Sequence, residues 1–385
     1  MAKTSSFLVA MAVGLTLVIP IRGHAQDVSF AGLAYSGDSR SIPARFPYSK
    51  RFDSSLPGRG IDGILQKDLA SIHPQNFTLV GTLDELKGRD EAVVVAFVLT
   101  NETVSTEQIG RVYKLLIQVR GQVLFFDFKS MMVLRAYPVS FAYIDALMEP
   151  PSEAIKDRDM GYVFNGSNGK PGIISRFEES LTKAKLPTAS SRYLQVTTVQ
   201  ISDQARSVFP SEYGSGLAET WLADTFSEKL STKLDIPILP YSKGYAIGNR
   251  MAIKVSDSTV YDLALPKPDY EFTLDLLKLK TVPYEIQAAG KSLIYGTLAS
   301  VKLEEPLSAH VYMDDQFKNG EVKLVPASQA NTDDFPAYED SINGLFTKLF
   351  GVISGDNNPW IKSAAIGPNT DKEIAATREL LKSCK

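Results

Sequence analysis

The segment that most constrains the fold is an uninterrupted run of eight apolar residues, Ala92 to Leu99, with the sequence AVVVAFVL. A strand that is apolar on both faces must be covered on both faces. Because the run is the longest apolar stretch after the amino-terminal region and is far short of the ~20 residues of a membrane helix, we predict a buried strand and no membrane-spanning helix after residue 25. We therefore expect a central strand in a sheet on which helices pack.

Segments with helix and strand periodicity occur in the same order twice. In each half, a turn-rich string precedes an amphipathic helix, a set of strands follows, and a second helix closes the set. The expected elements of the first half are a helix at 61–72, strands at 92–99, 113–119, 122–128 and 131–137, and a helix at 173–181. Those of the second half are a helix at 217–234, strands at 270–276, 293–303, 310–313 and 321–325, and a helix at 342–353. Arg120-Gly121 and Asn319-Gly320 are expected to form connections between strands.

Strands that cluster between helices favour an α+β fold over a doubly wound sheet, in which strands and helices would alternate. We predict two similar units, each a mostly antiparallel sheet packed by helices, and a C-terminal helical tail. The expected divisions are a signal peptide at 1–25, a first domain at 26–186, a second domain at 192–355 and the tail at 356–385, with a Pro/Ser-rich seam at 186–191. In the tail, Thr370 and Glu373 are expected to cap a helix that runs to Lys382.

The amino terminus has the pattern of a secretory signal peptide. Lys3 is followed by an uncharged apolar run from Phe7 to Ile21 and then by small residues that end at Ala25. The alternative is a membrane anchor, but fifteen apolar residues interrupted by Pro20 are fewer than the ~20 that span a bilayer. We predict cleavage between Ala25 and Gln26 and a periplasmic or secreted location.

Cysteine and histidine are scarce. Cys384 is the only cysteine, so intrachain disulfides are impossible, and a Gram-negative periplasm is favoured over a eukaryotic secreted setting, where several would be usual. We expect Cys384 to be a free thiol in a frayed tail, with an intermolecular disulfide as the alternative. After removal of residues 1–25 only His73 and His310 remain, in different halves. Because nucleophilic triads and zinc sites require such residues close together, we predict no catalytic, metal-binding or cofactor-binding residues and no enzyme activity.

Carboxylates are the remaining route to acid–base chemistry. Asp314-Asp315 and Asp333-Asp334 are the conspicuous pairs, and they suggest a hydrolase of envelope glycan as one alternative. We interpret both pairs as solvated loop acids. The whole chain has 41 basic and 44 acidic residues, a balance that does not favour nucleic acid as a partner.

Aromatic residues next to Gly, Ser or Pro form the candidate partner surface. They could instead cover the ends of the sheets. The residues are Tyr35, Tyr48, Phe52, Tyr241 and Tyr245.

Part of the second half resembles a known envelope family. Tyr193 to Val199 (YLQVTTV), Gly216 to Asp224 (GLAETWLAD), Leu234 to Leu239 (LDIPIL) and the strands at 268–274 and 292–303 resemble the curli-secretion-channel-like family and the amino-terminal domain of the Tol-Pal propeller protein. The resemblance implies a small periplasmic α/β unit. The lipid-bearing cysteine of the channel family is missing, and no paired membrane hairpins are evident, so only the fold and the envelope setting carry over.

Together these patterns predict a non-enzymatic periplasmic protein. It would act through contacts with envelope proteins, in assembly, secretion or surface-polymer export, and self-association into a homo-oligomer is left open. The alternatives are the carboxylate-dependent hydrolase and a pore-forming secretion subunit.

Overall fold

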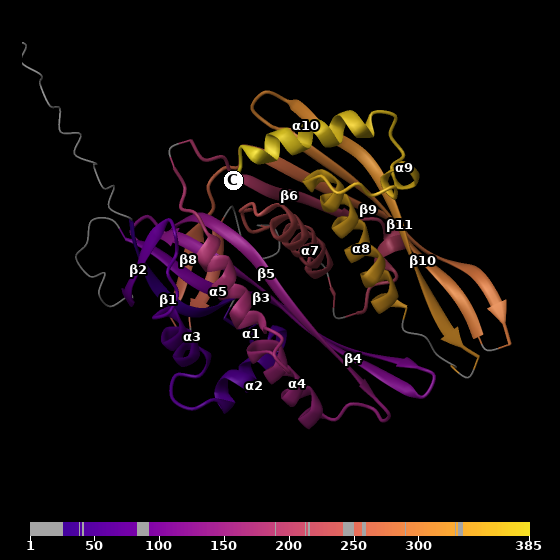
Figure 1. Ribbon diagram of the computed structural model, residues 1–385, viewed down its shortest axis with the longest axis horizontal. Coiled ribbons are helices and arrows are strands. Elements are labelled where there is room, and N and C mark those ends of the chain that lie inside the picture. The colour runs from indigo at the N-terminus through magenta and orange to yellow at the C-terminus, as the bar shows by residue number, and fades with distance from the viewer. Residues whose placement is uncertain are drawn as a thin grey trace, which may run out of the picture.

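The computed structural model describes residues 26–37, 39–40, 42–82, 92–188, 190–211, 213–214, 216–241, 250–255, 259–288, 290–327, 329 and 334–385. Two sheets, each packed by helices, and further helices at the C-terminal end make up these residues (Figure 1). The predicted α+β fold with two similar units and a helical tail is therefore confirmed.

The first sheet has the strand order β1-β3-β4-β5. Its strands are β1 (Gln26–Ser36), β3 (Val93–Ile109), β4 (Val112–Asp127) and β5 (Met132–Leu147), and β2 (Phe77–Thr82) lies beside the start of β1. β1 runs parallel to both β2 and β3, whereas the β3–β4 and β4–β5 pairs are antiparallel. The helices are α1 (Ile42–Arg45), α2 (Pro47–Ser55), α3 (Ile61–Leu69), α4 (Glu153–Asn165) and α5 (Ile173–Lys183).

The second sheet repeats this arrangement with the order β6-β9-β10-β11. Its strands are β6 (Leu194–Ile201), β9 (Tyr270–Gln287), β10 (Gly290–Glu305) and β11 (His310–Pro326), and β6 is parallel to β9. The helices are α6 (Asp203–Arg206), α7 (Leu217–Leu234), α8 (Phe335–Ser354), α9 (Ile361–Ala364) and α10 (Thr370–Lys382). In both sheets the first strand pairs in parallel with the first strand of a three-stranded meander.

One hairpin from the second half of the sequence belongs to the first sheet. β7 (Arg250–Val255) and β8 (Val260–Ala264) pair with each other, β8 contacts β5 through Ala264 and Met132, and β7 pairs with the end of β1. The first sheet thus closes into a ring of strands, and the segment predicted as the second domain supplies two of them.

This closure explains the doubly apolar run at 92–99. Val93, Val95 and Phe97 face the core beneath the helices of the first unit. Val94 and Val98 face a second core inside the ring, which also contains residues of the β7–β8 hairpin. Helices were expected on the sheet, but one face of β3 is covered by strands instead.

Two predicted connections are wrong. Arg120-Gly121 lies within β4 and Asn319-Gly320 within β11. Both glycines mark close approaches rather than turns: a Cβ on Gly121 would lie 2.9 Å from the ring of Phe97, and one on Gly320 would lie 2.9 Å from Ile294 Cγ2.

The C-terminal helix is packed and not frayed. Cys384 is only 1% exposed and belongs to the core of the second unit, and burial raises the pKa of its thiol to about 11. The thiol is free, as predicted, but the prediction that it lies in a frayed tail is wrong. Thr370 does not cap α10, because its hydroxyl donates to the carboxylate of Asp315. Asp315 is itself buried in β11, where it also accepts a hydrogen bond of 2.6 Å from the amide of Gly367, so it is not a solvated loop acid.

Candidate functional site

Two of the five aromatic residues predicted to form a partner surface are buried. Tyr35 is 2% exposed and packs edge-on against Phe46, with 5.2 Å between the ring centroids. Tyr241 is 4% exposed, and burial raises the pKa of its hydroxyl to about 12. Neither residue can offer a free ring to a partner, and for these two the prediction is corrected. Tyr245 and Ala25 lie outside the described residues, and Gln26 begins β1.

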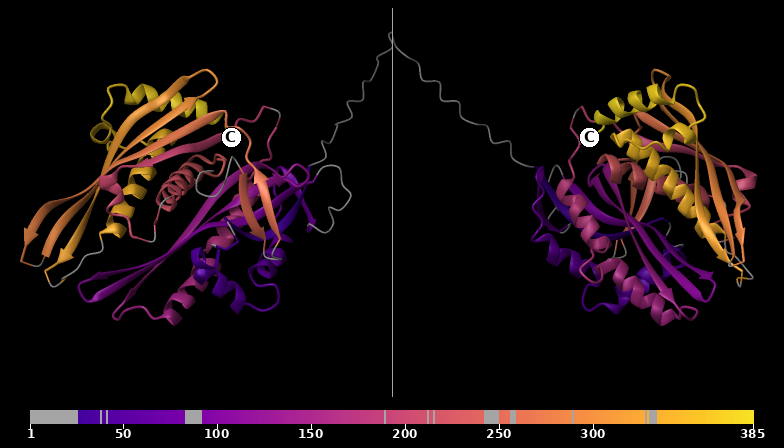
Figure 2. Two further views of the ribbon diagram at one scale, coloured as in Figure 1. Left: turned by 180° about the vertical axis from the view of Figure 1, so that it is seen from behind. Right: turned by 45° about the vertical axis from the view of Figure 1, so that its right-hand side comes forward.

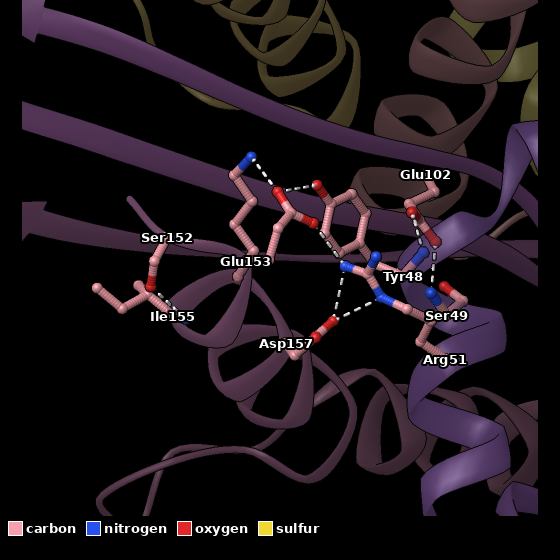
Figure 3. Close-up of polar contacts among 9 residues, drawn as sticks. Tyr48, Ser49, Arg51, Glu102, Ser152, Glu153, Ile155 and Asp157 are labelled. Carbon is pink, nitrogen blue, oxygen red and sulfur yellow. Dashed lines mark hydrogen bonds and ion pairs between the residues drawn. The ribbon is translucent and has the colours of Figure 1, made fainter. Parts of the chain in front are cut away.

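Tyr48 and Phe52 join α2 to α4. The Tyr48 hydroxyl donates to Glu153 at 3.2 Å, and Arg51 reaches Glu153 and Asp157 at 2.9 Å each (Figure 3). Phe52 stacks on Phe164 with 5.0 Å between the centroids. These two aromatic side chains thus contact α4 of the same chain, and these contacts hold α2 against α4.

The charges around Tyr48 are balanced by one another. Hydrogen bonds from Lys156 and Arg51 lower the pKa of Glu153 to about 2. At the start of α2, Glu102 accepts from the amides of Tyr48 at 2.9 Å and Ser49 at 2.7 Å (Figure 3). Burial raises the pKa of Glu102, and these hydrogen bonds oppose that rise. Since the cations and carboxylates pair with one another, this cluster has no evident surplus charge with which to attract a ligand.

A second polar group lies between the two units. Arg120 of β4 is 2% exposed, and none of its three guanidinium nitrogens has a hydrogen-bond partner among the described residues. Its neighbours include Trp221 of α7 and the buried Glu339 of α8. The adjoining hollow measures about 20 Å³, which is room for about one water molecule. This site is too small for an organic ligand.

A wider groove of about 270 Å³ lies between α5 and α7, over β5. Arg176, Glu179 and Lys183 line it from α5, and Glu228 of α7 and Asp235, the residue after α7, line the other side. Arg176 and Lys183 both pair with Glu179, at 3.3 and 2.8 Å. The groove therefore has both positive and negative side chains, and its charge favours neither an anionic nor a cationic ligand.

The outer face of β9–β11 differs from these sites because three neighbouring lysines on it have no carboxylate partner among the described residues, although Lys302 on the same face pairs with Glu304. We use this name for the face opposite the buried residues Leu279, Thr297 and Asn319. The sheet register aligns its side chains in rows: Lys278, Leu298 and Lys318 form one row, and Lys280, Gly296 and Gly320 form the next. None of these three lysines has a carboxylate within 4.0 Å among the described residues.

The paired glycines make the face concave. Gly296 and Gly320 are directly opposite each other in the β10–β11 ladder, so no side chain fills the space between Lys280 and the edge of β11. The hollow at this place measures about 580 Å³, and its lining has four lysines and no acidic residue. Thr297 and Asn319 of the buried face and Trp360, Ser363 and Ala364 at α9 also line it, so the hollow is not confined to the outer face. Its fourth lysine, Lys348, reaches Glu321 at 3.1 Å.

Apolar side chains follow the lysines toward the ends of the strands. Val282, Ile294 and Val322 form the next row, and Leu324 lies beyond it. Val282, Val322 and Leu324 are 40 to 59% exposed, and Tyr284 at the end of β9 is 66% exposed. The strands that carry them extend past the helices of the second unit (Figures 1 and 2). Large apolar side chains gathered on one exposed surface are typical of an interaction site.

Within the described ranges, no group of three or more His, Cys, Asp or Glu residues is arranged to hold a metal ion. No helix in those ranges is both long and apolar enough to cross a membrane.

The sequence did contain a signal for the outer face that our predictions missed. Lys278, Lys280, Val282 and Tyr284 alternate with other residues at the period of a strand, as do Lys318, Gly320, Val322 and Leu324. The first series lies beyond the predicted strand at 270–276, and the second crosses the expected turn at Asn319-Gly320. Because the predicted strands were shorter than β9 and β11, the two series were not predicted to lie on the same sheet face.

Comparison with known proteins assigns no family. No family model matches the chain, and no curated protein is significantly similar to it. The resemblance to the curli-secretion-channel-like family therefore stays a prediction.

Several solved structures are similar to parts of the chain. A Xanthomonas campestris protein from a family of unknown function is 15% identical, covers 43% of this chain and 83% of its own, and has a TM-score of 0.23. A Helicobacter pylori homolog of neuraminyllactose-binding hemagglutinin is 12% identical, covers 45% of this chain and 88% of its own, and has a TM-score of 0.26. A minor lipoprotein of Acinetobacter baumannii is 8% identical, with coverages of 42% and 89% and a TM-score of 0.20. At these values none of the three assigns a ligand or an activity to this chain.

Proposed function

We propose that this chain is a non-enzymatic protein of the cell envelope that acts by binding other envelope components, and that the outer face of β9–β11 is its binding surface. The observation that carries the proposal is the combination of unpaired lysines and exposed aliphatic side chains on one sheet face. The other face of the same sheet is covered by α8 and contributes to the core of the second unit. Exposing the apolar side chains adds nothing to that core, so binding is the use that explains them.

The predicted signal peptide supports an envelope setting for this binding, and envelope proteins remain the partners predicted from the sequence. A glycan hydrolase built on Asp314 and Asp315 is not favoured. The two residues are neighbours in β11, so their side chains point to opposite faces of the sheet. Asp315 is buried and already bonded to Gly367 and Thr370. This pair cannot flank one scissile bond.

Site-specific photo-crosslinking in living cells tests the proposal. A photoreactive residue in place of Leu324, on the outer face, is expected to give adducts with an envelope component. The matched control replaces Leu307, which is 92% exposed in the connection between β10 and β11, at the opposite end of these strands. Adducts at position 324 but not at 307 would support the outer face as the binding surface. No adducts at 324, or the same adducts from both positions, would refute it.

A further inference from the structure

We infer that the outer face of β9–β11 docks on the surface of a bilayer that contains anionic phospholipid. The inference rests on the proposed function and names the component that the face binds. It follows from the order in which charged and apolar side chains occur along the strands.

The face is divided into three zones along the strands. Asp275 and Asp314 lie toward the base of the sheet, where Lys302 is directly opposite Asp314, and Lys278, Lys280 and Lys318 occupy the middle. The apolar row begins at Val282, and in the row beyond it Leu324 is aligned with Ser292 and Glu285. Successive rows on one face of a sheet are about 7 Å apart. The acidic, basic and apolar zones thus follow one another over distances that match the interfacial region of a bilayer.

The middle zone fits phosphate groups. Each lysine ammonium offers three hydrogen-bond donors and attracts anions, and the lining of the hollow above Gly296 and Gly320 includes no acidic side chain. Toward the base of the sheet, Asp275, Asp314 and Glu304 outnumber the cation Lys302, so an anion held by the three middle lysines is favoured on the side of the apolar row. A phosphate held by the lysines would therefore have its attached chains beside Val282 and Val322.

The apolar zone favours a lipid surface over other anions. An acidic protein segment or a free phosphate could pair with the lysines. Neither would account for the exposed side chains of Leu324 and Tyr284 farther along the strands. In a bilayer, these side chains enter the boundary between headgroups and acyl chains while the lysines remain at the level of the phosphates. One surface then accounts for both zones.

Vesicle flotation with the exported protein, purified from expressing cells, tests this inference. The protein is expected to float with vesicles of phosphatidylglycerol and phosphatidylcholine and to stay at the bottom with vesicles of phosphatidylcholine alone. The triple variant K278Q/K280Q/K318Q should bind the anionic vesicles at least tenfold more weakly. The variant L324D should also weaken binding, because it places a charge in the apolar zone.

A matched variant controls for total charge. K170Q/K233Q/K372Q removes three lysines that are exposed elsewhere and should bind anionic vesicles nearly as well as the unmodified protein. Equal binding of both triple variants, or equal binding to both kinds of vesicle, would overturn the inference. If Leu324 crosslinks only to protein in cells and no vesicle binding occurs, the lipid inference fails while the proposed binding function stands. If neither occurs, both fail. Circular dichroism of each variant verifies folding.

Discussion

Arg120 lies over the indole ring of Trp221, with 5.6 Å between the guanidinium carbon and the ring centroid. Arg120 belongs to β4 of the first unit, and Trp221 belongs to α7 of the second. The two side chains therefore form a cation–π contact across the boundary between the units. The buried carboxyl of Glu339 in α8 is close enough for Arg120 to oppose the rise that burial causes in its pKa.

Removing the cation should weaken the whole molecule. We expect Arg120→Met to lower the free energy of unfolding by about 2 kcal/mol, because Trp221 loses a buried cation–π partner and Glu339 loses a charge that opposes its desolvation. Glu339→Gln in the same chain should recover part of this loss, so that the double-mutant cycle is not additive. The loss should also be smaller at low pH, where protonation neutralises Glu339. Urea unfolding of the four proteins measures these effects, and additive losses would contradict the coupling.

The thiol of Cys384 should react slowly in the folded protein. Its burial and its pKa of about 11 keep it protonated and shielded at pH 8. We expect a thiol reagent to label it much faster in urea than in buffer. Asp315→Ala should speed labelling in buffer, because it removes the acceptor of Gly367 and Thr370 at the start of α10. Asp314→Ala, which changes the exposed neighbouring carboxylate, should leave the rate unchanged. Rapid labelling of the unmodified protein in buffer would contradict the packed tail.

The carboxyl of Glu153 should titrate near pH 2 in the folded protein. Lys156 and Arg51 stabilise the charged form of Glu153. The stabilisation of the folded protein that these contacts give is therefore complete above the ordinary pKa of about 4.5, and it is lost as the pH falls toward 2. Because the group is exposed, high salt should move the pKa back toward its ordinary value. Carboxyl chemical shifts across a pH series measure this. The same pKa in Arg51→Gln would show that the contact in Figure 3 is unimportant in solution.

The β7–β8 hairpin should determine the stability of the first unit although it follows α7 in the chain. Ile253 is fully buried inside the ring of strands, and we expect Ile253→Ala to cost about 2–4 kcal/mol. Hydrogen exchange should then increase in β1 and β5, which the hairpin joins. Val260→Ala in the same hairpin, at a residue 50% exposed, should have little effect. Increased exchange confined to the second sheet would contradict the ring closure.

Local patterns predicted the helices well. The helix expected at 217–234 has those bounds in the structure, since its apolar residues recur at the helical period and Asp235 ends it in the left-handed conformation. Helix, strands and helix also follow one another in each half as predicted, but β1, α2, β2, α4 and the β7–β8 hairpin were not predicted. The features that were predicted depend on neighbours in the sequence, which the sequence displays directly.

Long-range features were not predictable in the same way. Nothing near Ile253 specifies that β7 pairs with β1, because that pairing joins residues more than 200 positions apart. Gly121 and Gly320 resembled turn residues, and their actual role depends on Phe97 and Ile294 in neighbouring strands. Because a turn was predicted at Asn319-Gly320, β11 was not predicted as one strand, and the outer face of β9–β11 was missed.

Closure of the first ring by a late hairpin has a consequence for synthesis. The strands up to β5 leave the ribosome well before Arg250, so the edges of β1 and β5 that await β7 and β8 are unpaired in the nascent chain. Exposed strand edges are sites of aggregation. A chain that ends before Arg250 would therefore keep these edges unpaired, and we expect such a fragment to aggregate.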